Sequence, residues 1–233
     1  MAAALCVGVV VLAIGHWPAA AVLFAFFLPS SLLSIVGRAR KTRLVDIGKH
    51  GPRDAWQVLA NGSVAALCAL LSLRFGMPLW AAFAGAFAAA SADTWGTEIG
   101  TLARGVPRSI LTGKTVAAGL SGAVSWQGSL ATVAGACVVG AVAAAVGIAG
   151  ILPVALGGCA GALIDSLAGA GIQALRWCPQ CERACEIDPH VCGTPTVLRR
   201  GFAWLGNDAV NALATLGGAL VAGILWTALP MMR

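Results

Sequence analysis

The basic residues of this chain are confined to three short segments, and long apolar stretches separate them. Thirteen of the fifteen Lys and Arg residues lie in segments 38–53, 104–114 and 176–200. Hydrophobic residues make up 59% of the chain and charged residues 10%, which leaves too little polar surface to coat a soluble globule. We therefore expect an all-α fold, a polytopic transmembrane helical bundle, in which small residues such as the 30 glycines allow close helix packing.

The lengths of the apolar stretches predict the number of helices. A transmembrane helix needs about 20 apolar residues. The sequence predicts seven helices, with six as the alternative, near 2–15, 18–36, 55–74, 77–97, 122–146, 150–176 and 207–229. The first segment is short, but no basic residues precede it, so we expect a helix and not a signal peptide. Residues 1–233 should form one integral membrane domain, with a Cys/His-rich loop over 177–200 between the sixth and seventh helices.

The positions of the basic segments predict the orientation of the chain. They follow the second, fourth and sixth predicted helices, and basic loops stay in the cytoplasm. The amino terminus and the 177–200 loop should therefore face the cytoplasm, and the carboxy terminus the outside, in a multi-pass protein of the cell (inner) membrane. The net charge of +6 records this orientation and contact with anionic lipid, so nucleic acid is not expected as a partner.

Acidic residues stand at or near the cytoplasmic ends of three predicted helices, at Asp93, Glu98, Asp165 and Asp208. A carboxylate next to lipid is costly and marks a functional site. Asp93 and Glu98 are roughly 140° apart around a helix unless the backbone breaks at Gly96 or Gly100. With such a break both carboxylates can meet Mg²⁺, which prefers one or two protein carboxylates together with phosphate oxygens and water. The alternative is a pair of interfacial acids that cap the helix or pair with nearby arginines.

A loop rich in Gly and hydroxyl residues follows the fourth predicted helix. Its candidate phosphate-binding residues are Gly113, Lys114, Thr115, Gly119, Gly122 and Ser125. Glycine lets backbone amides approach an anion, Lys supplies a point charge, and hydroxyls donate hydrogen bonds. The loop lacks the spacing of a Walker A motif, so no P-loop fold is implied. It is either a phosphate cradle or an ordinary cytoplasmic linker with an orienting lysine.

Polar clusters open the third and seventh predicted helices. Asn61 follows Gln57 in the first cluster, and Asn207, Asp208 and Asn211 form the second. Asn207 and Asn211 are four positions apart and share a helix face. A helix N-cap is the commoner role for Asn207. Three polar residues in one turn exceed what a cap needs, because buried polar groups require partners.

Four of the eight cysteines cluster between positions 178 and 192. Cys178 and Cys181 form a C-x2-C pair, and His190 and Cys192 form an H-x-C pair, which together have the spacing of zinc ligands. Cys185 can replace one of them. The alternative is a redox-active or merely thiol-bearing loop, in which disulfides are disfavoured by the cytoplasm.

The motifs also occur in a specific order. They are Q-V-x-A-N-G (57–62), A-D-T-x-x-x-E-I-G (92–100), L-T-G-K (111–114), G-A-V-S-x-x-G (122–128), D-S-x-x-G (165–169), C-x2-C (178–181), H-x-C-G-T (190–194) and N-D-x-V-N (207–211). From about Phe26 to the carboxy terminus this order resembles an integral membrane family long catalogued as of unknown function. That family includes transmembrane protein 19 and the chloroplast phytyl-phosphate kinase of vitamin E synthesis.

The resemblance implies a prenyl monophosphate kinase of the phytyl or geranylgeranyl type, which transfers the γ-phosphoryl group of CTP or another nucleotide with Mg²⁺ at the cytoplasmic membrane face. Asp93 and Glu98 would hold Mg²⁺, with Asp165 or Asp208 in support. Lys114 would neutralise phosphate. Ligands of the nucleotide and phosphates are expected among Asn61, Thr97, Arg104, Arg108, Gly113, Thr115, Gly122, Ser125, Asn207 and Asn211.

The partners expected on this basis are CTP or another nucleotide, a prenyl monophosphate, membrane lipid and a second copy of the chain in a homo-oligomer. The alternative function is a transporter of a small anion or lipid phosphate, because transporters also build their sites from broken helices with polar residues. A transporter places its polar groups near the midplane of the membrane, whereas most of those in this chain crowd one face.

Overall fold

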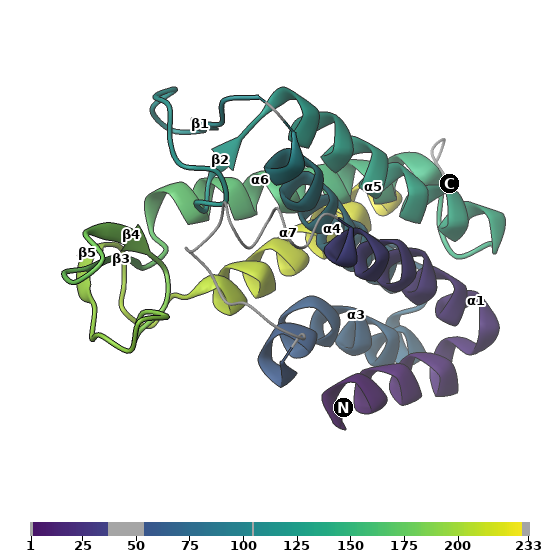
Figure 1. The fold of residues 1–233 in the computed structure, drawn as a ribbon. Coiled ribbons are helices and arrows are strands. Elements are labelled where there is room, and N and C mark those ends of the chain that lie inside the picture. Colours follow the sequence, from purple (N-terminus) through teal and green to yellow (C-terminus); the bar gives the residue numbers. More distant parts are fainter. Residues whose placement is uncertain (1, 37–53, 104, 230–233) are drawn as a thin grey trace.

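The computed structural model describes residues 2–36, 54–103 and 105–229. Within these ranges the chain forms helices α1 (Ala2–Ile35), α3 (Ala55–Phe75), α4 (Met77–Leu102), α5 (Trp126–Ala145), α6 (Ile151–Gly171) and α7 (Asn207–Ala228). Five of them, all except α4, are long and apolar enough to cross a membrane. The expected polytopic helical bundle is confirmed (Figure 1).

Helix α4 is the centre of the bundle. It packs against α1, α3, α5, α6 and α7, and every residue from Ala81 to Ala92 is buried. Ala and Gly dominate this run, so neighbouring backbones can approach α4 closely. Its small residues and two acids also lower its mean hydropathy. Contact with protein therefore replaces contact with lipid along this helix.

Helix α1 contains a backbone break. His16 has φ 51° and ψ −151°, which is outside the helical region, and two helical segments meet there. Figure 1 shows the ribbon doubling back at this point, so the two segments form a hairpin. The predicted helices 2–15 and 18–36 are these two arms. The structure therefore has six helical elements within the described ranges, where seven were expected, because the arms join without an intervening loop.

Short strands lie at one end of the bundle and were not predicted. β1 (Arg108–Ser109) pairs with β2 (Ala123–Val124), and β3 (Leu175–Cys178) pairs with β4 (Arg183–Cys185) and β5 (Val197–Arg200) in the order β4-β3-β5. In Figure 1, α3, α5 and α7 begin and α4 and α6 end at this end of the bundle. The described parts of the basic segments 104–114 and 176–200 share it, whereas 38–53 lies outside the described residues.

The strands also correct two predicted helix boundaries. Helix α5 begins at Trp126 and not at 122, because residues 123–124 pair with β1 and the side chain of Ser125 caps the helix by accepting from the N–H of Gly128 at 3.2 Å. Helix α6 ends at Gly171 and not at 176, because residues from Leu175 onward form β3. In both cases an apolar run continues from a helix into a strand, so hydropathy alone does not separate them.

Replacement of Gly85 by Ala should destabilise the bundle. A Cβ at Gly85 would lie 2.4 Å from Cβ of Ala222 and 2.6 Å from the carbonyl oxygen of Gly218 in α7. Overpacking of this kind costs about 1–3 kcal/mol of the free energy of unfolding. The measurement is denaturant or thermal unfolding of Gly85→Ala in detergent. The matched control is Gly8→Ala, since a Cβ there meets nothing within 4 Å. Equal stability of the two variants would contradict the packing described here.

Candidate functional site

A cavity of about 1760 Å³ opens within the bundle and collects most of the predicted site residues. The predicted residues in its lining are Asn61, Asp93, Thr97, Glu98, Gly119, Gly122, Ser125, Asp165, Asn207, Asp208 and Asn211. They come from α3, α4, α6, α7 and the loop that contains β1 and β2. Segments up to 150 positions apart in the sequence, from Asn61 to Asn211, thus share one cavity.

The remaining lining of the cavity is largely apolar. Leu23, Phe24 and Phe27 contribute from the second arm of α1, Trp56 from α3, and Leu163 from α6. All five side chains belong to helices that meet the criteria for a membrane span. The cavity therefore joins a hydrocarbon-lined part to a part rich in carboxylates and amides.

Asp93 and Asp165 form the central acidic pair of the cavity. Their side chains, from α4 and α6, are hydrogen-bonded to each other, and Oδ1 of Asp165 is buried without a hydrogen-bond partner among the described residues. Two carboxylates in contact cannot both stay ionised unless a proton or a cation lies between them. The pair is consequently built either to share a proton or to bind a cation.

The break at Gly96 or Gly100 that would bring Asp93 and Glu98 together is absent. Helix α4 continues unbroken through Gly96 and Gly100 to Leu102. Gly96 instead allows close contact with α5, because a Cβ there would clash with Oγ1 of Thr132. Asp93 and Glu98 both line the cavity without a break, and the acid that contacts Asp93 is Asp165. The contact between Asp93 and Asp165 was not predicted, although Asp165 was expected to support the metal site.

The amide cluster of α7 also faces the cavity. The N-cap of α7 is Gly206, so Asn207 does not take the capping role and lies in the first turn with Asp208. Asn211, one turn later, is buried. Asn61 of α3 also lines the cavity, and its Nδ2 donates to the carbonyl oxygen of Gln57 at 2.9 Å. The amide oxygen of Asn61 accepts no hydrogen bond from the described residues.

The Gly-rich loop between α4 and α5 contributes Pro107, Ile110 and its second half to the cavity. Residues 118–125 line it, and Gly122, with φ 78°, sits so close to Ala170 that a Cβ would clash. Gly113, Lys114 and Thr115 belong to an exposed turn, in which Nη1 of Arg108 donates to the carbonyl oxygen of Gly113 at 2.9 Å. These three residues and Arg108 are absent from the lining, and Arg104 lies outside the described residues. None of the described lining residues is Lys or Arg.

Glu186 is a cavity residue that the sequence did not reveal. Its carboxylate accepts hydrogen bonds from the N–H of Ser121 (2.9 Å), Oγ of Ser121 (2.8 Å) and Nε2 of Gln173 (2.8 Å). Burial raises the pKa of Glu186, and the hydrogen bonds from Ser121 oppose that shift. In the sequence Glu186 lies among cysteines, 65 positions from Ser121, and no motif links the two. Its carboxylate joins the Cys/His loop to the Gly-rich loop beside the cavity.

The four predicted zinc ligands come together, as their spacing indicated. One ligand atom from each of Cys178, Cys181, His190 and Cys192 lies within 4.8 Å of all the others. Hydrogen bonds from Thr194 and His190 lower the pKa of Cys192 to about 6. Cys185 is not part of this group.

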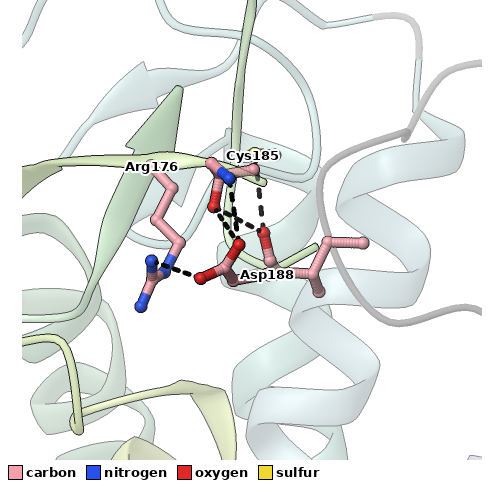
Figure 2. Close-up of polar contacts among 5 residues, drawn as sticks. Arg176, Cys185 and Asp188 are labelled. Carbon is pink, nitrogen blue, oxygen red and sulfur yellow. Dashed lines mark hydrogen bonds and ion pairs between the residues drawn. The ribbon is translucent and has the colours of Figure 1, made fainter. Parts of the chain in front are cut away.

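Cys185 belongs instead to the hydrogen-bonded core of the same loop. Its Sγ donates to the carbonyl oxygen of Ile187 at 3.8 Å, and the guanidinium of Arg176 lies 3.0 Å from the carboxylate of Asp188 (Figure 2). Thr196 also donates to Asp188 from its N–H and its hydroxyl, both at 2.9 Å. These hydrogen bonds, the one from the N–H of Thr196 first, hold the pKa of Asp188 below its usual range.

Replacement of Glu186 by Ala should loosen the contact between the two loops. The change leaves the N–H of Ser121 without its acceptor and leaves the amide of Gln173 with Oγ of Ser121 alone, and a buried unsatisfied group costs about 1–3 kcal/mol. We expect a lower unfolding midpoint for Glu186→Ala in detergent. Glu182→Ala is the matched control, since Glu182 is an exposed acid of the same loop. Equal midpoints in the two variants would show that the contact contributes nothing to stability.

Comparisons with known proteins agree with this architecture. The family model "Integral membrane protein DUF92" matches residues 1–219. The chain is 31% identical to "Protein PGR" of Arabidopsis thaliana, over 84% of this chain and 77% of that protein. It is 32% identical to an uncharacterized membrane protein of Methanocaldococcus jannaschii, over 89% and 76%, and 29% identical to one of Synechocystis sp., over 95% and 79%. No solved structure matches. The chain belongs to the integral membrane family DUF92.

Proposed function

We propose that this protein is a kinase that transfers the γ-phosphoryl group of CTP, or of another nucleotide, to a prenyl monophosphate of the phytyl or geranylgeranyl type. The observation that carries the proposal is the composition of the cavity of about 1760 Å³. Acids and amides line one part, and aliphatic and aromatic side chains line the rest. A lipid monophosphate has the same two chemistries, a charged head and a hydrocarbon tail.

The apolar lining suits the prenyl chain of the acceptor. Phe24, Phe27 and Leu163 present hydrocarbon surface, and burial of each CH₂ group contributes about 0.8 kcal/mol. The phosphate head would then lie near the acids of α4 and α6. The family resemblance of the ordered motifs supports a prenyl phosphate as acceptor and CTP as donor.

The acidic pair suits a magnesium nucleotide. Asp93 and Asp165 supply adjacent carboxylate oxygens, which are hard ligands of the kind that Mg²⁺ takes, and Glu98 and Asp208 line the same cavity. Bound there, Mg²⁺ would neutralise the charge of the transferring phosphoryl group. That contribution matters because none of the described lining residues carries positive charge.

The amides and the Gly-rich loop would position the two substrates. Asn61 and Asn211 offer hydrogen-bonding groups to a phosphate or a ribose from the neighbouring helices α3 and α7. Gly119 and Gly122 let the backbone of the 118–125 segment approach a phosphate closely, since neither carries a side chain. Positioning of this kind accounts for most of the catalysis of phosphoryl transfer.

The chemical step then needs no general base. An ionised oxygen of the prenyl monophosphate forms a bond to the γ-phosphorus of CTP, and the bond from that phosphorus to the β–γ bridging oxygen breaks. CDP leaves with the bonding electron pair, and the product is the prenyl diphosphate. Because the attacking oxygen is already deprotonated at neutral pH, the side chains have only to hold the metal and align the phosphates.

The direct test is CDP release by purified protein in detergent, given CTP, Mg²⁺ and phytyl or geranylgeranyl monophosphate. Free prenyl alcohol and ATP serve as comparisons. We expect release with the monophosphate only. Release with the alcohol would assign the protein to an earlier phosphorylation, and no release with any pair would favour transport of a small anion or lipid phosphate.

Removal of either charge of the acidic pair should abolish turnover. In Asp93→Asn and Asp165→Asn one metal ligand is lost, and we expect kcat to fall by about a hundredfold or more. Glu182→Gln is the control, because Glu182 is an exposed acid of the Cys/His loop that does not line the cavity. Retained turnover in both aspartate variants, with native unfolding midpoints, would refute the metal assignment.

The proposed site faces the cytoplasm of the cell (inner) membrane. The described Lys and Arg residues near it, in segments 108–114 and 176–200, fit the positive-inside rule. A fusion of alkaline phosphatase to the carboxy terminus should be active, because α7 runs away from the strand end (Figure 1). The same reporter fused after Glu182 should be inactive. The reverse pattern would place the cavity on the outer face.

A further inference from the structure

The Cys/His loop holds four ligand atoms in a group of metal-site size. Sγ of Cys178 lies 3.6 Å from Sγ of Cys192, and Nδ1 of His190 lies 3.2 Å from the same Cys192 sulfur. A tetrahedral Zn²⁺ site with Zn–S bonds of about 2.3 Å and a Zn–N bond of about 2.0 Å sets ligand atoms roughly 3.5–3.8 Å apart. The observed separations are close to these values.

The separations exclude a disulfide in this state. A disulfide bond is about 2.0 Å long, whereas the sulfurs of Cys178 and Cys192 lie 3.6 Å apart, and all four cysteines of the loop are free. His190 is 2% exposed, and its Nε2 is buried without a hydrogen-bond partner among the described residues. The Nδ1 side of this buried imidazole faces Sγ of Cys192, and a buried imidazole among three thiols has the donor set of a metal site.

The backbone around the group has the local geometry that thiolate ligands require. The N–H of Cys181 points to Sγ of Cys178 at 3.4 Å, which supports negative charge on that sulfur. Gly193, with φ 82°, makes the turn in which its N–H donates to the carbonyl oxygen of His190 at 2.7 Å. This turn brings Cys192 back beside the C-x2-C pair.

We propose that Cys178, Cys181, His190 and Cys192 bind one Zn²⁺ ion in a closed structural site. Four protein ligands leave no position for water or substrate, which is the arrangement of a structural and not a catalytic zinc. None of the four residues lines the cavity. The ion holds the loop in the conformation in which Glu186, one residue after β4, reaches Ser121 and Gln173 at the cavity.

Metal analysis tests the site directly. Wild-type protein purified under reducing conditions without added metal should contain about one zinc per chain. The double variant Cys178→Ser with Cys181→Ser should lose it. Cys185→Ser is the matched control, because Cys185 is another buried thiol of the same sheet and should keep the full zinc content. Zinc-free wild-type protein, or equal loss in Cys185→Ser, would overturn the proposal.

A second pair of variants covers the case in which the double serine variant does not fold. His190→Cys keeps four ligands and should retain zinc, whereas His190→Ala should lose it. With Co²⁺ in place of zinc, thiolate-to-cobalt absorption should be stronger in His190→Cys than in the wild type, because a fourth thiolate replaces a nitrogen. Equal zinc content in His190→Ala and wild type would remove His190 from the ligand set.

Limited proteolysis tests the structural role. Arg183 and Arg199 are exposed in the loop and offer sites for trypsin. Removal of the ion with a chelator should speed cleavage there by about tenfold or more, because local unfolding becomes easier. Unchanged cleavage would show that the metal does not hold the loop. These measurements do not use nucleotide turnover, so the zinc site and the kinase assignment can fail separately.

Discussion

The close approach of α4 to its neighbours is the constraint on which the cavity depends. Backbone carbonyls of α7 lie near enough to Gly85 and Gly161 that neither position has room for a Cβ. Because α6 and α7 pack closely against α4, Asp165 contacts Asp93, and Asp208 lines the same cavity. A cluster of carboxylates among apolar helices is expensive. The packing of small residues elsewhere on the same helices holds the acids in place in spite of that cost.

Much of the fold could be predicted because it follows from simple periodicities. Apolar stretches, most of them about 20 residues long, identified every helix of the described residues. The distribution of Lys and Arg predicted that the described parts of the loops 104–114 and 176–200 share one end of the bundle, as Figure 1 shows. The strands escaped prediction because Leu175–Cys178 and Ala123–Val124 continue the hydrophobic runs of the adjacent helices. Their partners are set by loop contacts that one segment alone does not reveal.

Most individual residues of the site could be predicted from the sequence, but the contacts between them could not. An acid in an apolar run is visible in the sequence, so Asp93 and Asp165 were both found, whereas their contact depends on the approach of two helices 72 positions apart. Glu186 was missed since its partners, Ser121 and Gln173, are ordinary polar residues in other elements. Lys114 was included on the composition of its loop and on the family resemblance, and the turn in which it lies holds it away from the cavity. For Cys178, Cys181, His190 and Cys192 the contacts themselves could be predicted, because the spacing of these residues in the sequence is that of zinc ligands.

The low hydropathy of α4 also affects how the chain enters the membrane. During synthesis α4 emerges before α6 and α7, so Asp93 is made 72 residues ahead of Asp165. Until α6 and α7 are synthesised, the Ala-rich helix α4 with its two acids lacks these neighbours, which help to bury it in the folded bundle. Residence beside the insertion machinery until α6 and α7 arrive would shield its carboxylates from lipid. The helix at the centre of the finished protein is thus the one whose integration depends most on segments translated later.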